Sequence, residues 1–182
     1  MHVFYYWKSF DEDLKAGRIG WLKSDRVKLG QMRDRSPDRI WAFRTPRGRK
    51  GELQLVASMK WSDKSLVPLA KIEANAVMFY NPNDPTCVRY TESGKDEHIA
   101  EITAMMRNQF PKAFAANFQG ENGVQAMDGD FLRRFESLVK SYASAPLLDA
   151  AIAQAAVRPS LKPTAKAIDA SAAKPVPQTS PN

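Results

Sequence analysis

The sequence has few of the residues that catalytic and metal sites use most often. It has one cysteine, Cys87, and two histidines, His2 and His98, among 182 residues. A single cysteine allows neither an intrachain disulfide nor a thiolate metal cluster, and neither histidine stands in a pattern that indicates a catalytic base. No apolar run approaches the roughly 18 residues that a membrane-spanning helix needs. The sequence therefore predicts a cytoplasmic protein with no membrane partner and no cofactor, and it indicates no catalytic or metal-binding residue.

Positive charge, in contrast, is abundant and unevenly placed. The chain has a formal net charge of +7, and residues 1–60 contain 14 Lys+Arg against 7 Asp+Glu. The remaining residues contain 13 of each, so all of the net charge lies in the first third of the chain. Such asymmetry favours an anionic partner, most commonly nucleic acid, although a solvated basic surface without a partner is the alternative.

The stretch from Arg39 to Trp61 combines this charge with aromatic side chains. Two runs with the alternating, β-branched and aromatic character of strands flank a turn that contains Gly48 and Gly51, which predicts a β-hairpin. The tip of this hairpin carries four cations that could contact phosphates: Arg44, Arg47, Arg49 and Lys50.

All four tryptophans lie within the first 61 residues, in the same region as the excess charge. Tryptophan is most often a core residue, but rings that project into one concavity can also hold a base between their faces. We predict that Trp7, Trp41 and Trp61 line such a pocket, with the cations of the hairpin tip around it.

The order of the other patterns predicts a mixed α+β fold. Residues 3–7 have the character of a buried central strand, and a capping-box pattern from Ser9 to Glu12 predicts a short helix from Phe10 to about Ala16. Residues 20–23 and 27–29 are read as short strands or a strand and an irregular segment. Further strands are predicted at 40–43, 53–59, 71–80 and 87–90, loops at 32–38 and 114–129, and helices at 96–109, about 130–142 and 146–157.

This order predicts five or six strands that curl into a small β-barrel, with helices flanking it, in a single domain of residues 1–157. A doubly wound nucleotide-binding fold would need strands that alternate with helices, which the middle of the chain lacks. Residues 158–182 contain five prolines and few large apolar side chains, so we predict a disordered Pro/Ala-rich tail.

The aromatic strand that runs into Trp7-Lys8-Ser9, the helix behind it and the later strand-hairpin-strand resemble the PUA-like superfamily, particularly its EVE and YTH-like branches. The closest match is the tryptophan followed by Lys-Ser, which adds Ser9 to the candidate binding residues. The resemblance implies a small β-barrel with flanking helices that binds nucleic acid, in several members by enclosing a modified base in an aromatic cage.

The leading prediction is therefore a non-catalytic domain that binds DNA or RNA, as a reader of a modified base. An alternative is an accessory module that recruits a protein partner through its C-terminal helices or tail, with the basic hairpin serving only for solubility. A third hypothesis, a nuclease or base-modifying enzyme, would need a cluster of carboxylates that folding brings together.

Overall fold

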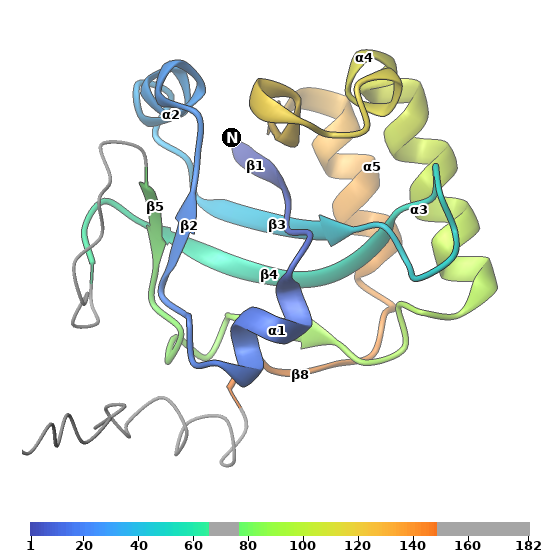
Figure 1. The fold of residues 1–182 in the computed structure, drawn as a ribbon, viewed down its shortest axis with the longest axis horizontal. Coiled ribbons are helices and arrows are strands. Elements are labelled where there is room, and N and C mark those ends of the chain that lie inside the picture. The colour runs from blue at the N-terminus through green and yellow to red at the C-terminus, as the bar shows by residue number, and fades with distance from the viewer. Residues whose placement is uncertain (66–76, 149–182) are drawn as a thin grey trace, which may run out of the picture.

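The computed structural model of the chain describes residues 1–65 and 77–148. Its elements are ordered as a mixed α+β fold, as the sequence predicts (Figure 1). In chain order they are β1 (His2–Tyr6), α1 (Phe10–Lys15), β2 (Trp21–Lys23), α2 (Arg26–Arg33), β3 (Arg39–Arg44), β4 (Gln54–Ser62), β5 (Val77–Tyr80), β6 (Val88–Tyr90), α3 (Asp96–Gln109), α4 (Pro111–Ala115), the 3-10 helix η1 (Gly120–Gly123), β7 (Val124–Met127), α5 (Gly129–Val139) and β8 (Ser144–Pro146).

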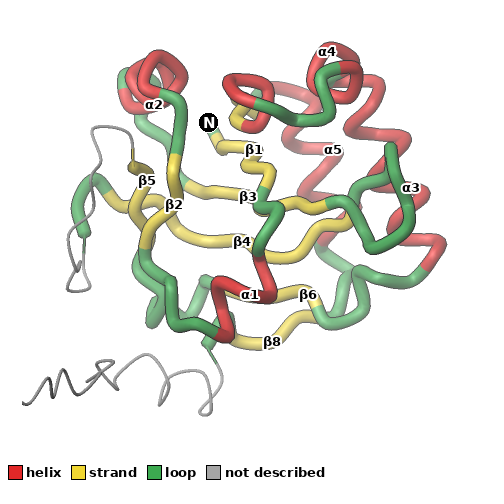
Figure 2. The backbone as a smooth tube through the Cα atoms, viewed as in Figure 1, coloured by secondary structure: helices red, strands yellow, loops and turns green. Residues whose placement is uncertain are grey.

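The strands form one strongly curled sheet (Figure 2). Its main path runs β2-β5-β4-β3-β1-β7, while β6 pairs with β4 and β8 pairs with β6. β1 and β3 are parallel, and the other pairs are antiparallel. Among the residues that the structure describes, β2 and β7 do not pair with each other, so the sheet is a half-barrel. The predicted curled sheet with flanking helices is confirmed, and β1 lies inside the sheet, between β3 and β7.

The two faces of this sheet bury two separate hydrophobic clusters, because successive side chains of a strand point to opposite faces. In β3, Ile40 and Ala42 belong to the first cluster, and Trp41 and Phe43 belong to the second. We call the first the β2-side cluster, since it includes Leu22 of β2 together with residues of α1 and β5. We call the second the α5-side cluster, since it is formed with residues of α3, α4 and α5.

Apolar burial holds the helices on the sheet. Phe4, Phe43 and Phe135 of the α5-side cluster are completely buried, and a side chain of this size contributes about 1.5–3 kcal/mol when it leaves water. One buried hydrogen bond fixes α3 against the start of β4, from the Leu53 amide to the Thr103 hydroxyl at 2.8 Å. None of the helices among the described residues is long and apolar enough to cross a membrane.

Two segments differ from the sequence prediction. Residues 27–29, read as a short strand or irregular segment, lie in helix α2, which Asp25 caps by accepting from the amides of Val27 and Lys28 at 3.0 and 3.1 Å. The loop predicted for 114–129 contains η1 and strand β7, which pairs with β1. A four-residue strand between glycine-bearing segments is too short for its alternation to be recognised.

The predicted last helix also differs at its start. Pro146 ends strand β8 and does not begin a helix, because residues 144–146 pair with β6. The rest of that helix, the predicted tail at 158–182 and the first part of the strand predicted at 71–80 lie outside the described residues.

Candidate functional site

An open pocket lies between the end of β1, helix α1 and strand β2. Its volume is about 350 Å³, within the range of small-molecule sites. We call it the Asp13 pocket. Its wall contains four aromatic residues, three cations and a single carboxylate: Tyr5, Tyr6, Trp7, Trp21, Lys8, Arg18, Lys23 and Asp13.

The carboxylate of Asp13 is the centre of the polar part of this pocket. The Trp7 indole N–H and the Ser9 hydroxyl both donate to its Oδ2 at 2.7 Å. Arg18 donates from Nε to Oδ1 at 2.7 Å, and its Nη2 lies at the same distance from that oxygen. A carboxylate has about four lone-pair positions, so these four donors saturate it.

These contacts also keep Asp13 charged. Partial burial would by itself raise the pKa of Asp13, but the hydrogen bonds from Trp7, Ser9 and Arg18 outweigh burial and leave the pKa below its usual value. Burial raises the pKa of Tyr5 well above its usual value, and the charge of Asp13 adds to that rise. At neutral pH the pocket therefore contains an ionised carboxylate and a protonated tyrosine hydroxyl.

Ser9 is placed in this network and not in the capping box that the sequence predicts. It precedes α1, but its side chain makes no cap hydrogen bond to the helix amides. Its hydroxyl donates to the ionised carboxylate of Asp13, one turn along the helix, and this charge-assisted hydrogen bond is stronger than the neutral one in which the hydroxyl would accept from a helix amide. The helix itself is confirmed, and Gly17 follows it with a φ of 67°.

Trp7 and Trp21 are the two tryptophans of the pocket, and their exposure differs. The Trp7 ring is 4% exposed and packs edge-on against Phe10, with ring centroids 5.1 Å apart. Trp21 is half-buried, and it forms no close ring pair with another aromatic residue among those described. Trp21 therefore offers the more accessible indole face, and Trp7 forms a fixed wall.

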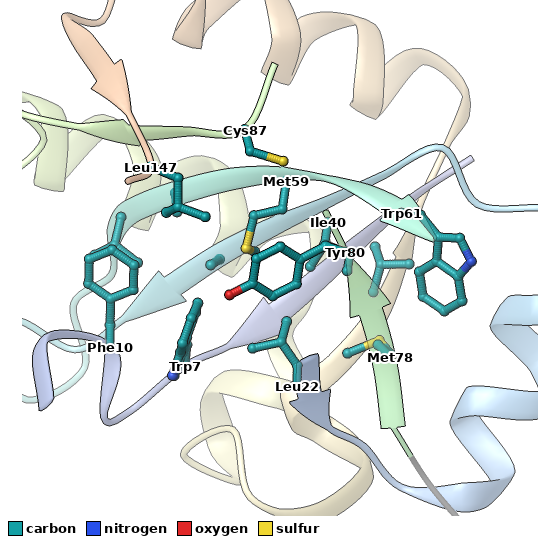
Figure 3. Close-up of a cluster of buried hydrophobic side chains, with 14 of the residues drawn as sticks. Trp7, Phe10, Leu22, Ile40, Met59, Trp61, Met78, Tyr80, Cys87 and Leu147 are labelled. Carbon is teal, nitrogen blue, oxygen red and sulfur yellow. The ribbon is translucent and has the colours of Figure 1, made fainter. Parts of the chain in front are cut away.

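The structure does not bring Trp7, Trp41 and Trp61 together, contrary to the predicted shared pocket. Trp41 is 5% exposed in the α5-side cluster, on the opposite face of the sheet, where its indole N–H donates to His2 Nδ1 at 2.9 Å. Trp61 is 9% exposed in the β2-side cluster. It lies at the other end of that cluster from Trp7, with Tyr80 between the two in Figure 3.

Strand register explains both placements. Phe4 of β1 pairs with Trp41 of β3, and because Trp7 lies an odd number of residues from Phe4, its side chain points to the other face. Arg39 pairs with both His2 and Lys60, so Trp61 is level with the start of β1. Trp7 follows the end of that strand, roughly 20 Å away at about 3.3 Å per residue.

Two of the four cations of the hairpin tip, Arg44 and Arg49, have carboxylate partners within the protein. Arg44 forms an ion pair with Asp11 and donates to Gln54 at 2.9 Å. Arg49 is bound by two carboxylates, Glu52 and Asp96.

The other two cations of the tip are free to bind a partner. Arg47 and Lys50 are exposed, and neither has an ion pair among the described residues. Two of the four predicted phosphate contacts are thus available, and two have structural partners.

The hairpin tip lies beside α3 and away from strand β2 (Figure 1), which contributes residues to the Asp13 pocket. Arg107 of α3 donates to the carbonyl of Gly51 at 2.7 Å. The base of the hairpin is closer to the pocket, since the hydroxyl of Tyr6, a pocket residue, donates to Thr45 Oγ1 at 3.0 Å. The basic tip and the aromatic pocket are separate features joined through Tyr6 and Thr45.

Sequence reasoning missed several residues of the pocket. Trp21 stands in a stretch with Arg18 and Lys23, so a tryptophan between two cations was a usable signal. It was missed because β2 has only three residues and no readable alternation. Asp13 stands in the first turn of α1, where an acid complements the helix dipole, and nothing in the sequence indicates that three side chains converge on it.

The acids do not form a metal-binding cluster in the part of the chain that the structure describes. No group of three or more His, Cys, Asp and Glu side chains there could hold a metal ion. Asp13 is the only acid that lines its pocket. Asp128 and Asp130, which stand near each other in sequence, form ion pairs with Arg35 and Arg133, respectively. The Asp13 pocket therefore does not supply the cluster of carboxylates that the hypothesis of a nuclease or base-modifying enzyme needs.

No protein-family model, curated protein or solved structure matches the chain. The function has to be argued from the residues of the Asp13 pocket and their surroundings.

Proposed function

We propose that the chain is a nucleic-acid-binding domain whose Asp13 pocket takes up a single base, with a modified base as its specific ligand. The observation that carries the proposal is the pocket itself, where a half-buried indole of Trp21 stands beside three cations. An accessible aromatic face together with positive charge is the combination that binds unpaired nucleotides.

In this proposal the base stacks on Trp21, and Trp7 and Tyr5 limit how far it enters. Stacking of this kind contributes about 1–3 kcal/mol per base. Lys8 and Lys23 are exposed on the rim of the pocket, where they contact the phosphates on either side of the base. A base in a duplex reaches the pocket only after it leaves the stack, so single strands and flipped bases are the expected ligands.

Arg47 and Lys50 supply a second electrostatic contact further along the strand. They stand at the hairpin tip with Thr45 between them and the pocket wall, so they contribute affinity without reading the base. Modification of the base is proposed on the resemblance of Trp7-Lys8-Ser9 to PUA-like domains of the EVE and YTH-like branches. The same proposal places the protein in the cytoplasm.

The test is binding of fluorescently labelled single-stranded DNA and RNA, followed by anisotropy, with and without a modified base. Trp21→Ala should weaken binding by roughly tenfold or more, as loss of one stacking contact implies. Phe114→Ala is the matched control, because Phe114 is also a half-buried aromatic residue but lies on α4, outside the pocket. Equal affinity of wild type and Trp21→Ala for every oligonucleotide would contradict the proposal.

The alternative of a protein-interaction module depends on the C-terminal helices and the tail. Helices α3 and α5 are described, whereas most of the predicted last helix and the tail lie outside the described residues, and no observation on the described part favours that function over nucleic-acid binding. Partners recovered from a lysate before and after nuclease treatment separate the two, since a protein partner of its own would survive the nuclease.

A further inference from the structure

We infer that the Asp13 pocket selects nucleotides with an uncharged base and discriminates against bases that carry a positive charge. The inference rests on the proposed function and adds the chemical class of the ligand. It is carried by the geometry around Asp13, whose four short contacts decide which polar groups of the pocket are left for a ligand.

The first step is that Asp13 has no free acceptor position. Its Oδ2 accepts hydrogen bonds from Trp7 and Ser9, and its Oδ1 is contacted by Nε and Nη2 of Arg18. All four distances are 2.7 Å. The carboxylate side chain is 18% exposed, so a ligand would have to displace one of these donors to reach it. The negative charge of the pocket is therefore already neutralised within the protein.

The second step is that two of the three positive charges in the pocket are not neutralised within the protein. Lys8 and Lys23 line the pocket and are exposed, and neither ammonium group has an ion pair or hydrogen bond among residues 1–65 and 77–148. The Arg18 side chain is 52% exposed, but two of its nitrogens contact Asp13, so its charge is paired with that carboxylate. A ligand in the pocket therefore meets two unpaired cations, Lys8 and Lys23, and one ion pair.

The third step compares this arrangement with what a cationic ligand needs. Aromatic faces attract cations through their quadrupoles, and the rings of Tyr5, Trp7 and Trp21 would favour such a ligand if they stood alone. Here they stand among ammonium and guanidinium groups, whose direct repulsion of a charged base exceeds the attraction of a ring at similar distance. Phosphate groups, in contrast, find free donors on Lys8 and Lys23.

The test uses two oligonucleotides that differ only in the position of one methyl group. N6-methyladenine is uncharged at neutral pH, whereas its isomer 1-methyladenine is protonated and carries a positive charge, so the two bases have nearly equal size and ring area but differ in charge. We expect the single strand with N6-methyladenine to bind roughly tenfold or more tightly, because like charges near a protein surface repel. The pair 5-methylcytosine and 3-methylcytosine repeats the comparison on a pyrimidine.

The variant Arg18→Gln tests whether the preference for the uncharged base depends on the pairing of Asp13 with Arg18. It removes one cation and frees both acceptor positions of Oδ1, while Trp7 and Ser9 still hold Oδ2. The preference for the uncharged isomer should shrink several-fold in this variant. The matched control is Arg134→Gln, which removes an exposed arginine of α5 that does not line the pocket, and it should leave the preference unchanged.

Each outcome bears on one claim. Equal or tighter binding of the cationic isomers, or a preference that Arg18→Gln does not change, overturns the inference while nucleic-acid binding stands. If wild-type protein binds none of the oligonucleotides, modified or unmodified, the proposed function fails and the inference fails with it. Tighter binding of both uncharged isomers, reduced by Arg18→Gln and retained by Arg134→Gln, supports both.

Discussion

The indole nitrogen of Trp7 lies 2.7 Å from Oδ2 of Asp13, so the first strand and the first helix are joined by a hydrogen bond to an ionised acceptor. Hydrogen bonds to charged groups contribute more than neutral ones, about 1.5–3 kcal/mol each. The contact fixes the buried ring of Trp7 at the wall of the pocket and holds α1 against the end of β1.

Asp13→Asn should therefore lower both stability and binding. The amide has one oxygen in place of two and directs an NH₂ group toward donors, so at least one of Trp7, Ser9 and Arg18 loses its acceptor. We expect the free energy of unfolding to fall by about 2–4 kcal/mol, measured by urea denaturation. Asp130→Asn is the control, since its ion pair with Arg133 is largely exposed, and it should have little effect. A loss as small as that of the control would show that Asp13 does not organise the pocket.

Stability should also fall with acidification below about pH 6.5, because of His2. Burial lowers the pKa of His2, as do the N-terminal amine and Arg39, against the raising effects of Glu136 and Asp38. The unfolded chain, with an ordinary histidine pKa of about 6.5, then binds a proton more readily than the folded one, so protonation favours unfolding as the pH falls.

The structural reason for this pH dependence is that His2 Nδ1 accepts the Trp41 indole N–H at 2.9 Å, which needs an unprotonated nitrogen. Urea denaturation of wild type at several values between pH 8 and pH 5 should show the loss, and His2→Gln, which keeps an acceptor but does not titrate, should show less of it. If the free energy of unfolding changes with pH equally in both proteins, the effect comes from a group other than His2.

The hairpin tip should contribute to binding through Arg47 and Lys50 only. Replacing both by alanine removes two free cations, which should reduce the slope of log K against log salt by about 1.4 for a single strand. Replacing Arg49 should change that slope less, because its guanidinium is already bound by Glu52 and Asp96. A larger slope change for Arg49→Ala than for the double variant would reverse this assignment.

Substitutions of Trp21 and Trp41 should affect different properties, binding for Trp21 and stability for Trp41. Trp41→Ala leaves a cavity in the α5-side cluster and should lower the free energy of unfolding by about 3–5 kcal/mol. Trp21→Ala should lower it less, because Trp21 is only half-buried. Trp21→Phe should remove most of the tryptophan emission that acrylamide quenches, because the other three rings are at most 9% exposed. If quenching is unchanged in Trp21→Phe, then the accessible indole of the pocket is not Trp21.

Much of the fold could be predicted from local patterns. The aromatic run at 3–7, the runs on either side of the hairpin and the apolar spacing of α3 and α5 correspond to elements of the structure. These patterns are strong because each element buries a complete face and is long enough for its period to be visible. Short elements were missed or misread where one capping residue, Asp25, or one strand partner, β1, decided the outcome.

For the candidate site, the residue types could be predicted from the sequence, but their arrangement could not. That tryptophan and positive charge share the first third of the chain can be read from composition alone, which needs no fold. Which of these residues meet depends on long-range strand pairing. The pairing of Phe4 with Trp41 turns Trp41 away from Trp7, and the pairing of Arg39 with His2 and Lys60 carries Trp61 to the far end of the cluster. Trp21 and Asp13 lie with Trp7 in the pocket instead. Asp13 is only six residues from Trp7 in the chain, but the pattern of a short helix does not indicate where one carboxylate of its first turn points.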